Sequence, residues 1–174
     1  APPGSARVDV PAGELLPAAL MEHEGVVDDP PPGVAGGGLL VRAGSAPRHD
    51  PRRPLPAGSH VEEVLPVTCL AHDDRVEVPE GAQPTIVDAA HPVLAGISGP
   101  MPTLLGYNRV VLKAGSTLVA SVGSDPLIAT AQVGKGRSLV WTSDIGPHWC
   151  PEPFVQWSGF APLMANMVDW VSSR

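Results

Sequence analysis

The sequence predicts an α/β fold, and three observations carry that prediction. Residues 126–133 and 137–143 are two β-rich runs joined by Gly134-Lys135-Gly136, whose glycines can take the positive φ of a tight hairpin. The second run is apolar enough at its centre for a strand that is buried on both faces. The segment after Ser158 has the apolar spacing of an amphipathic helix.

Proline and aromatic residues are unevenly distributed along the chain. Eleven of the 22 prolines lie within the first 56 residues, whereas all seven aromatic residues follow residue 106. Because aromatic side chains supply much of a core's buried area, we expect the C-terminal two-thirds to be the well-packed part. Residues 1–35 are predicted to be an irregular, Pro-rich segment with one short helix over 17–24, and residues 36–174 to form the domain.

The first half of that domain is predicted to alternate short strands and helices. Leu39–Val41 suits a buried strand, and residues 44–58 form a Pro/Arg/Gly loop. Ser59 and Glu62 have capping-box spacing, which predicts a short helix that ends before Pro66. Strands are expected over 67–70, 75–78 and 85–87, and a helix start at Asp88 with Pro92 in its first turn.

The second half is predicted to contain two hairpins and a long helix. The first hairpin joins residues 107–113 to 117–122 through Ala114-Gly115-Ser116, and the second joins 126–133 to 137–143. Ser158 is the expected cap of the C-terminal helix. The apolar residues predicted to form its buried face are Phe160, Leu163, Met164, Met167, Val168 and Val171.

Composition excludes several classes of function. A formal charge of −7 and a pI near 5.2 argue against a nucleic-acid or anionic-membrane surface. No apolar run approaches the roughly 18–20 residues that span a bilayer, and the two cysteines form no metal or disulfide framework. We therefore expect a cytoplasmic protein with reduced thiols, without nucleic-acid or membrane partners.

The candidate site is the polar loop Ser143–Trp149, which follows the buried strand. Loops at the ends of buried strands are where α/β sheets usually place ligands. His148 has Asp144 four residues before it and Glu152 four residues after it, so either carboxylate could orient the imidazole as a base. The alternative is that His148 and Asp144 close the turn and satisfy backbone groups there.

The sequence gives weaker support for a nucleophile, a metal site or a phosphate-binding loop. No Gly-x-Ser-x-Gly or Gly-x-Cys-x-Gly elbow is present, Cys69 lies in a strand-like run, and Cys150 is two residues from His148 in one loop. No spacing among Asp88, His91 and the loop residues is diagnostic of a metal site. Gly134-x-Gly136 is too short for a phosphate loop, so neither a metal nor a cofactor is expected.

Several ordered segments together resemble a known family, the putative glutamine amidotransferases. The matching segments are Gly36–Leu40, Val61–Val67, Asp73–Pro79, His91–Gly96, Leu105–Arg109, Asp125–Leu127, Gly134–Arg137 and Thr142–Trp149. The resemblance covers roughly residues 33 to 172. It implies a class I glutamine amidotransferase-like fold, which is a flavodoxin-like three-layer αβα sheet, here with β-hairpins in the C-terminal half and incomplete at its N-terminus. Trehalose-utilisation-type proteins are more distant relatives.

The resemblance also bears on the site. In class I amidotransferases a Cys on a nucleophile elbow is served by a His and a Glu that follow a late strand, and His148 holds a comparable place by chain order. Glu152 is the looser counterpart, because the family spacing is His-x-Glu and here it is His-x-x-x-Glu. Because no elbow Cys is present, the resemblance implies that glutamine is not hydrolysed by the usual thioester route.

Three functions remain open from the sequence. The first is a glutamine amidotransferase-like domain without glutaminase activity that binds a small polar metabolite or partner at loop 143–149, with Asn108, Ser143 and Trp149 as ligand contacts. The second is a hydrolase or isomerase that uses His148 as general base on a sugar-derived substrate, with Asp144 or Glu152. The third is a structural module completed by a partner chain or by a second copy of itself.

Overall fold

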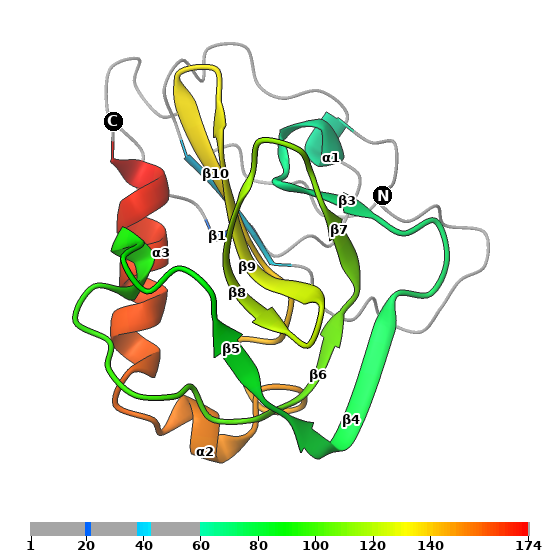
Figure 1. The fold of residues 1–174 in the computed structure, drawn as a ribbon, viewed down its shortest axis with the longest axis vertical. Coiled ribbons are helices and arrows are strands. Elements are labelled where there is room, and N and C mark those ends of the chain that lie inside the picture. Colours follow the sequence, from blue (N-terminus) through cyan, green and yellow to red (C-terminus); the bar gives the residue numbers. More distant parts are fainter. Residues whose placement is uncertain (1–19, 22–37, 43–59, 174) are drawn as a thin grey trace, which may run out of the picture.

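The centre of the molecule is a six-stranded mixed sheet (Figure 1). The computed structural model describes residues 20–21, 38–42 and 60–173. The sheet has the order β1-β2-β10-β9-β8-β5, with β1, β2 and β10 parallel and β9, β8 and β5 continuing it antiparallel. Its strands are β1 (Leu20–Met21), β2 (Gly38–Arg42), β5 (Pro84–Ile86), β8 (Thr117–Val122), β9 (Asp125–Val133) and β10 (Gly136–Trp141).

Two antiparallel strand pairs accompany this sheet. They are β3 (Val67–Cys69) with β7 (Val110–Leu112), and β4 (Arg75–Ala82) with β6 (Leu104–Asn108). The helices are α1 (His60–Val64), the 3-10 helix η1 (Pro92–Leu94), α2 (Glu152–Val155) and α3 (Phe160–Ser172). Figure 1 shows α3 and α2 on one side of the central strands, and α1 with β3 and β7 on the other.

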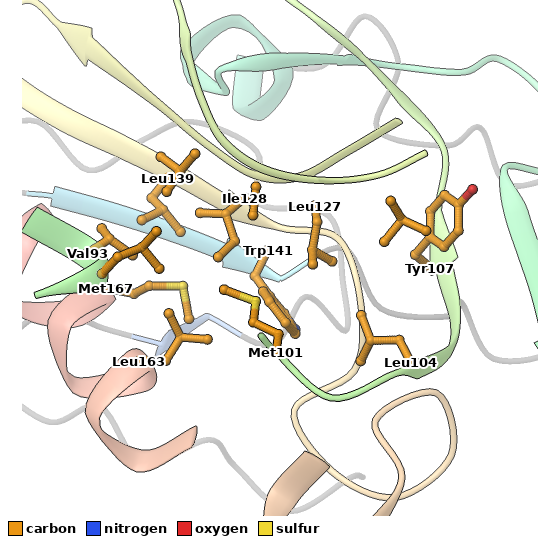
Figure 2. Packing of buried hydrophobic residues seen from close by; sticks show 14 of the residues in the cluster. Val93, Met101, Leu104, Tyr107, Leu127, Ile128, Leu139, Trp141, Leu163 and Met167 are labelled. Atoms are coloured by element: carbon orange, nitrogen blue, oxygen red, sulfur yellow. The ribbon is translucent and has the colours of Figure 1, made fainter. Parts of the chain in front are cut away.

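Two apolar clusters explain this layering. The larger cluster packs side chains from β8, β9 and β10 against η1, α2 and α3 (Figure 2). The smaller one joins Ala129 and Val140, from the central strands, to Leu65, Val67 and Val110. Because successive strand residues point to opposite faces, Val140 enters the second cluster while Leu139 and Trp141 enter the first. The predicted three-layer α/β fold, with a strand buried on both faces, is therefore confirmed.

The hairpin between β9 and β10 is the tight turn that the sequence predicts, but only one of its glycines is conformationally required. Val133 pairs with Gly136, so the turn consists of Gly134 and Lys135. Gly134 has φ +57°, whereas Gly136 has no positive φ. A positive φ at the first turn residue alone is the pattern of a type II′ turn, which matches the twist of the flanking strands.

The C-terminal helix forms as predicted. Leu163, Met167 and Val171 are buried on one face of α3, and the intervening apolar positions pack at the margin of the same cluster. The cap differs from the expectation, because Gly159 rather than Ser158 precedes the helix and no side chain caps it. Asn166 ties α3 to η1, because its side-chain amide donates to the carbonyls of Val93 and Ala95.

The predicted hairpin between residues 107–113 and 117–122 is wrong. The turn exists, since Ser116 N–H donates to the Lys113 carbonyl at 3.2 Å and Gly115 has φ +82°. The two strands then separate: β7 pairs with β3, and β8 pairs with β5 and β9. Burial explains the choice, because Val110 on β7 is drawn into the second cluster while β8 lies over the first.

Two further local predictions are corrected. The helix expected over 17–24 is contradicted by β1, since Leu20 and Met21 pair with β2 as a strand; the rest of the 1–35 segment lies outside the described residues. The helix expected to start at Asp88 is η1 instead, capped by the His91 side chain, while Asp88 Oδ1 accepts the Ala90 N–H in a turn. The short helix at 60–64 is confirmed, but its predicted cap at Ser59 is not described.

His91 links η1 to both the sheet and α3. Its Nδ1 accepts the Val93 N–H at 3.2 Å, its Nε2 lies 3.3 Å from Thr130 Oγ1, and its ring lies 5.3 Å from that of Trp170. Because Nδ1 accepts, the proton of the neutral imidazole sits on Nε2. Burial lowers the pKa of His91, and the nearby Asp88 only partly opposes this.

We expect Met167→Asp to lower the free energy of unfolding by about 3 to 5 kcal/mol, because it places an unpaired carboxylate in the larger cluster. Ala165→Asp, on the exposed face of the same helix, is the matched control and should change stability little. Urea unfolding of both variants measures the difference. Equal stability of the two variants would show that this face of α3 is not buried.

We also expect His91 to make stability depend on pH. Its pKa is lowered on folding, so the unfolded chain binds more protons; the stabilisation is present above the unfolded value of about 6.5 and is lost as the pH falls through the folded pKa. His91→Asn keeps a capping oxygen and removes the titration, so its unfolding free energy should fall less between about pH 7.5 and about pH 5 than that of the wild type. His72→Asn, at an exposed position, should behave like the wild type. Identical pH profiles for His91→Asn and wild type would contradict this account.

Candidate functional site

The loop that follows β10 is bonded at both ends to β6. Asn108 N–H donates to the Thr142 carbonyl, and Leu105 N–H donates to the Trp149 carbonyl, each at 2.7 Å. Thr142 is also fixed to the central sheet, since its hydroxyl donates to the Pro126 carbonyl at 2.9 Å. The loop therefore bridges the central sheet and the β4–β6 pair.

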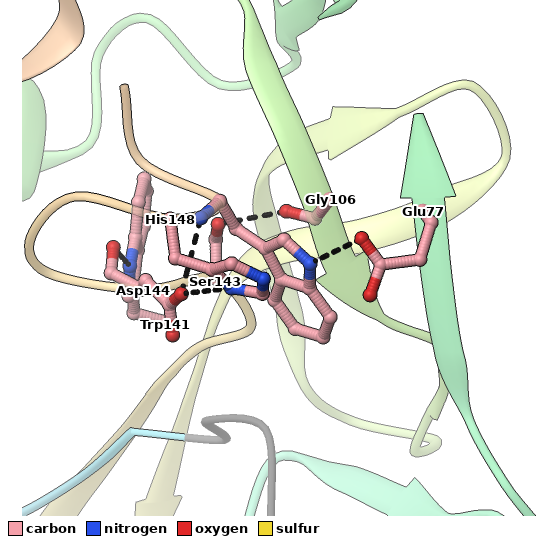
Figure 3. A network of polar contacts seen from close by, with 7 residues as sticks. Glu77, Gly106, Trp141, Ser143, Asp144 and His148 are labelled. Atoms are coloured by element: carbon pink, nitrogen blue, oxygen red, sulfur yellow. Dashed lines mark hydrogen bonds and ion pairs between the residues drawn. The ribbon is translucent and has the colours of Figure 1, made fainter. Parts of the chain in front are cut away.

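Asp144 lies at the centre of this loop, with a side chain only 6% exposed. Its Oδ2 lies 3.1 Å from His148 Nδ1 and accepts the Trp149 N–H, also at 3.1 Å. Its carbonyl accepts the Trp141 indole N–H at 2.9 Å (Figure 3). With these two contacts on Oδ2, the buried Asp144 side chain holds the loop backbone and the imidazole together.

His148 presents its imidazole to solvent, with 58% of the side chain exposed. Because the Asp144 carboxylate can only accept, His148 Nδ1 carries the proton and Nε2 is left as an acceptor that faces away from the contact. His148 has φ +139°, a conformation that side chains rarely adopt and that persists only where the surroundings enforce it. The arrangement can accept a hydrogen bond from a ligand or remove a proton from one.

Ser143 and Trp149, expected from the sequence as ligand contacts, are buried residues at the two ends of the loop. Ser143 is fully buried and its hydroxyl donates to the Gly106 carbonyl at 2.8 Å. Trp149 is 1% exposed, and its indole N–H donates to Glu77 Oε2 at 2.9 Å. Both residues hold the loop from inside, and their contact with a ligand stays a prediction.

Asn108 is buried at the end of β6, beside the start of the loop. Its side-chain amide donates to Asp74 Oδ1 at 2.7 Å, and burial raises the pKa of Asp74. Its Oδ1 accepts no hydrogen bond from the part of the chain that the structure describes. Within that part, no hydrogen bond joins Asn108 to the side chains of Asp144 or His148, so its role at the site also stays a prediction.

Glu152, the other carboxylate considered for His148, is exposed in the first turn of α2. Its Oε1 accepts the Gln156 side-chain amide at 2.7 Å. The structure pairs His148 with Asp144, and no hydrogen bond among the described residues links it to Glu152. The role that family order implies for Glu152 therefore rests on sequence alone.

Neither cysteine is placed as a nucleophile. Cys150 is fully buried, and burial together with the charge of Asp144 raises its pKa to about 12. Cys69 lies in β3, where burial and then Glu62 raise its pKa to about 11. At neutral pH both groups are thiols, and the thiolate is the reactive form.

Two residues that support the loop were not foreseen from the sequence: Glu77 on β4 and Gly106 on β6. They are directly opposite each other in the β4–β6 register, and Trp149 reaches Glu77 across 72 residues of sequence. The alternation of Val76, Glu77 and Val78 indicates that Glu77 points away from its neighbours' face. No spacing along the chain indicates that Glu77 meets the indole of Trp149.

A surface cavity of about 330 Å³ lies away from this loop, beside η1 and the end of α3. Its lining residues are Pro92, Arg137, Asn166, Asp169, Trp170 and Ser173. Arg137 lies 5.1 Å above the Trp170 ring and donates to the Trp170 carbonyl at 3.1 Å. Its charge thus stabilises the C-terminus of α3, as a cation at that end of a helix does.

No three or more His, Cys, Asp or Glu side chains in the part of the chain that the structure describes are grouped so as to hold a metal ion. None of the helices described there is long and apolar enough to cross a membrane.

Comparison with known proteins gives a family and a fold. Residues 56–173 match the family model described as "Putative glutamine amidotransferase". No curated protein matches the chain. Among solved structures, it is similar to cytoplasmic protein STM3548 from Salmonella typhimurium (TM-score 0.67, 31% identity, 80% of this chain and 56% of that one). It is also similar to cytoplasmic protein STM1381 from Salmonella typhimurium LT2 (TM-score 0.68, 30% identity, 79% of this chain and 56% of that one). The chain thus spans 56% of the length of each of these proteins.

We expect Gly106→Ala to displace the Trp149 indole, because an added Cβ would lie 2.4 Å from Trp149 Nε1. The free energy of unfolding should fall by about 1 to 3 kcal/mol, the usual cost of overpacking. Gly146→Ala, in the loop that contains Trp149, is the matched control: its Cβ would meet nothing within 4 Å and its φ is not positive. Unfolding curves that agree for the two variants would show that Trp149 does not pack on β6.

Proposed function

Because the chain belongs to the putative glutamine amidotransferase family, we propose that it is a glutamine amidotransferase-like domain that binds a small polar metabolite at loop 143–149 and lacks glutaminase activity. One observation carries the proposal. His148 is more than half exposed, while its Nδ1 is held by the buried Asp144 carboxylate. The loop therefore offers an oriented imidazole to solvent, at the end of a buried strand.

The chemistry of the imidazole indicates what the ligand supplies. With the proton on Nδ1, Nε2 accepts, so the ligand group that meets it donates: a hydroxyl, an amide N–H or an ammonium. The nearby carboxylates of Asp144 and Glu77 disfavour an anionic ligand at this position. A polyhydroxy or amide-bearing metabolite satisfies both conditions.

The state of the two cysteines supports the absence of glutaminase activity. A thioester route needs a thiolate within reach of its base and beside backbone donors for the oxyanion. Cys69 and Cys150 both have raised pKa values, and no hydrogen bond among the described residues joins either thiol to His148.

A second candidate function uses the same residues for catalysis. The contact between His148 and Asp144 is the arrangement that orients a general base, and the positive φ of His148 is the kind of strain found at active sites. This favours a hydrolase or isomerase acting on a sugar-derived substrate, with His148 as base. Glu152 would then act only after a rearrangement that brings it toward the imidazole.

Partners and location are further parts of the proposal. A module completed by a partner chain or by a second copy of itself is the third function that we keep as a proposal. Their descriptions as cytoplasmic, and the two thiols of this chain, support residence in the cytoplasm.

We expect no ammonia release from glutamine above background, and no change in Cys150→Ser, because neither thiol ionises at neutral pH. A coupled glutamate dehydrogenase assay measures the release. Turnover that disappears in Cys150→Ser would identify that residue as a nucleophile and end the proposal in its present form.

Binding is tested by titration with a sugar lactone and with glutamine as probes. The readout is the amide chemical shifts of residues 143–149. The proposal is supported if the shifts saturate in the wild type and the affinity they report falls at least tenfold in His148→Gln, but not in His72→Gln. Lactone hydrolysis by the wild type, lost in His148→Gln, would favour the catalytic candidate instead. Shifts that are unaffected by His148→Gln would place the ligand elsewhere and contradict both.

A further inference from the structure

We propose that Glu77 is a positioning residue for His148 and acts on it through Trp149. The inference rests on the proposed function, since it concerns the same imidazole. Glu77 lies on β4, outside loop 143–149, and touches neither His148 nor Asp144 through any hydrogen bond of the described residues.

Two contacts connect Glu77 to the imidazole, and a third holds the imidazole from its other side. Glu77 Oε2 accepts the Trp149 indole N–H at 2.9 Å. The Trp149 ring stacks on the His148 ring, with centroids 5.6 Å apart and planes 24° from parallel. On its other side, His148 Nδ1 meets Asp144 Oδ2 at 3.1 Å. Figure 3 shows Glu77 and the Asp144–His148 contact on opposite sides of this arrangement.

The β4–β6 register makes room for the indole. Glu77 is paired with Gly106, so the residue opposite the carboxylate has no side chain. The Trp149 ring occupies that space so closely that a Cβ on Gly106 would lie within 2.4 to 2.7 Å of three indole atoms. Gly106 therefore fixes where the ring lies, and Glu77 fixes how it is rotated.

The polarity of these groups explains why rotation matters. Trp149 is buried, and a buried indole N–H needs an acceptor. A carboxylate accepts more strongly than a neutral group, so Glu77 favours the one ring orientation that reaches it. That orientation lays the indole face against the imidazole, which limits His148 to the position in which Nδ1 points at Asp144 and Nε2 at solvent.

A purely structural role for Glu77 predicts a different outcome from a positioning role. If Glu77 only stabilises the fold, its loss lowers the melting temperature and leaves His148 unchanged in the remaining folded protein. If Glu77 positions His148, its loss frees the imidazole. The neutral ring then shifts from the Nδ1–H tautomer toward the Nε2–H tautomer that free histidine prefers.

The test is ¹⁵N NMR of the His148 ring and of the Trp149 indole, without ligand and at alkaline pH. In Glu77→Ala we expect the indole N–H to move upfield and to exchange faster with solvent, and the Nε2–H tautomer of His148 to gain population. Glu77→Gln retains an acceptor and should restore most of the wild-type spectrum. Glu80→Ala, on the same strand and exposed, is the matched control and should change neither signal.

Two results would overturn the inference: a His148 tautomer that is the same in Glu77→Ala and wild type, or a change of equal size in Glu80→Ala. Should Glu77→Ala not fold, Trp149→Phe removes the N–H that Glu77 accepts and should shift the His148 tautomer in the same direction; an unchanged tautomer there also overturns it. Because these spectra contain no ligand, they are independent of the binding test. If neither the wild type nor any variant binds a probe, the proposed function is rejected, whereas the positioning role is still decided by these spectra.

Discussion

The buried carboxylate of Asp144 is the group on which the loop depends. It bonds to the imidazole of His148 and to the backbone of Trp149, while its own carbonyl holds the indole of Trp141. A charge in this position is tolerable only with such donors around it, and the donors in turn fix the loop. A structural role and a functional role of Asp144 are therefore compatible. The same carboxylate closes the turn and also orients the imidazole.

The fold supplies the two surfaces between which this loop is held. Trp141 ends β10 inside the larger cluster, and Thr142 is hydrogen-bonded to β9, so the loop starts from the buried core of the molecule. It then crosses to β6, which bonds its backbone at Asn108 and at Leu105. A site placed on rigid elements keeps its geometry better than one on a free loop, which suits an exposed imidazole in a strained conformation.

Local patterns predicted much of this arrangement, and long-range contacts account for the rest. The periodicity of α3, the two-sided burial of Leu139–Trp141 and the Asp144–His148 spacing follow from neighbouring residues. The partner of β7 does not, because its burial against α1 and β3 outweighs the short turn that follows it. Likewise, nothing near Trp149 in the sequence indicates that its indole reaches Glu77.

The protonation of the His148 ring in the wild-type protein tests the central claim most directly. Long-range ¹H–¹⁵N correlation spectra at alkaline pH distinguish a protonated from an unprotonated ring nitrogen. The account predicts that Nδ1 carries the proton, held by Asp144, and that Nε2 is bare and available to a ligand. A predominant Nε2–H form, as in free histidine, would show that Asp144 does not orient the imidazole and would contradict the account.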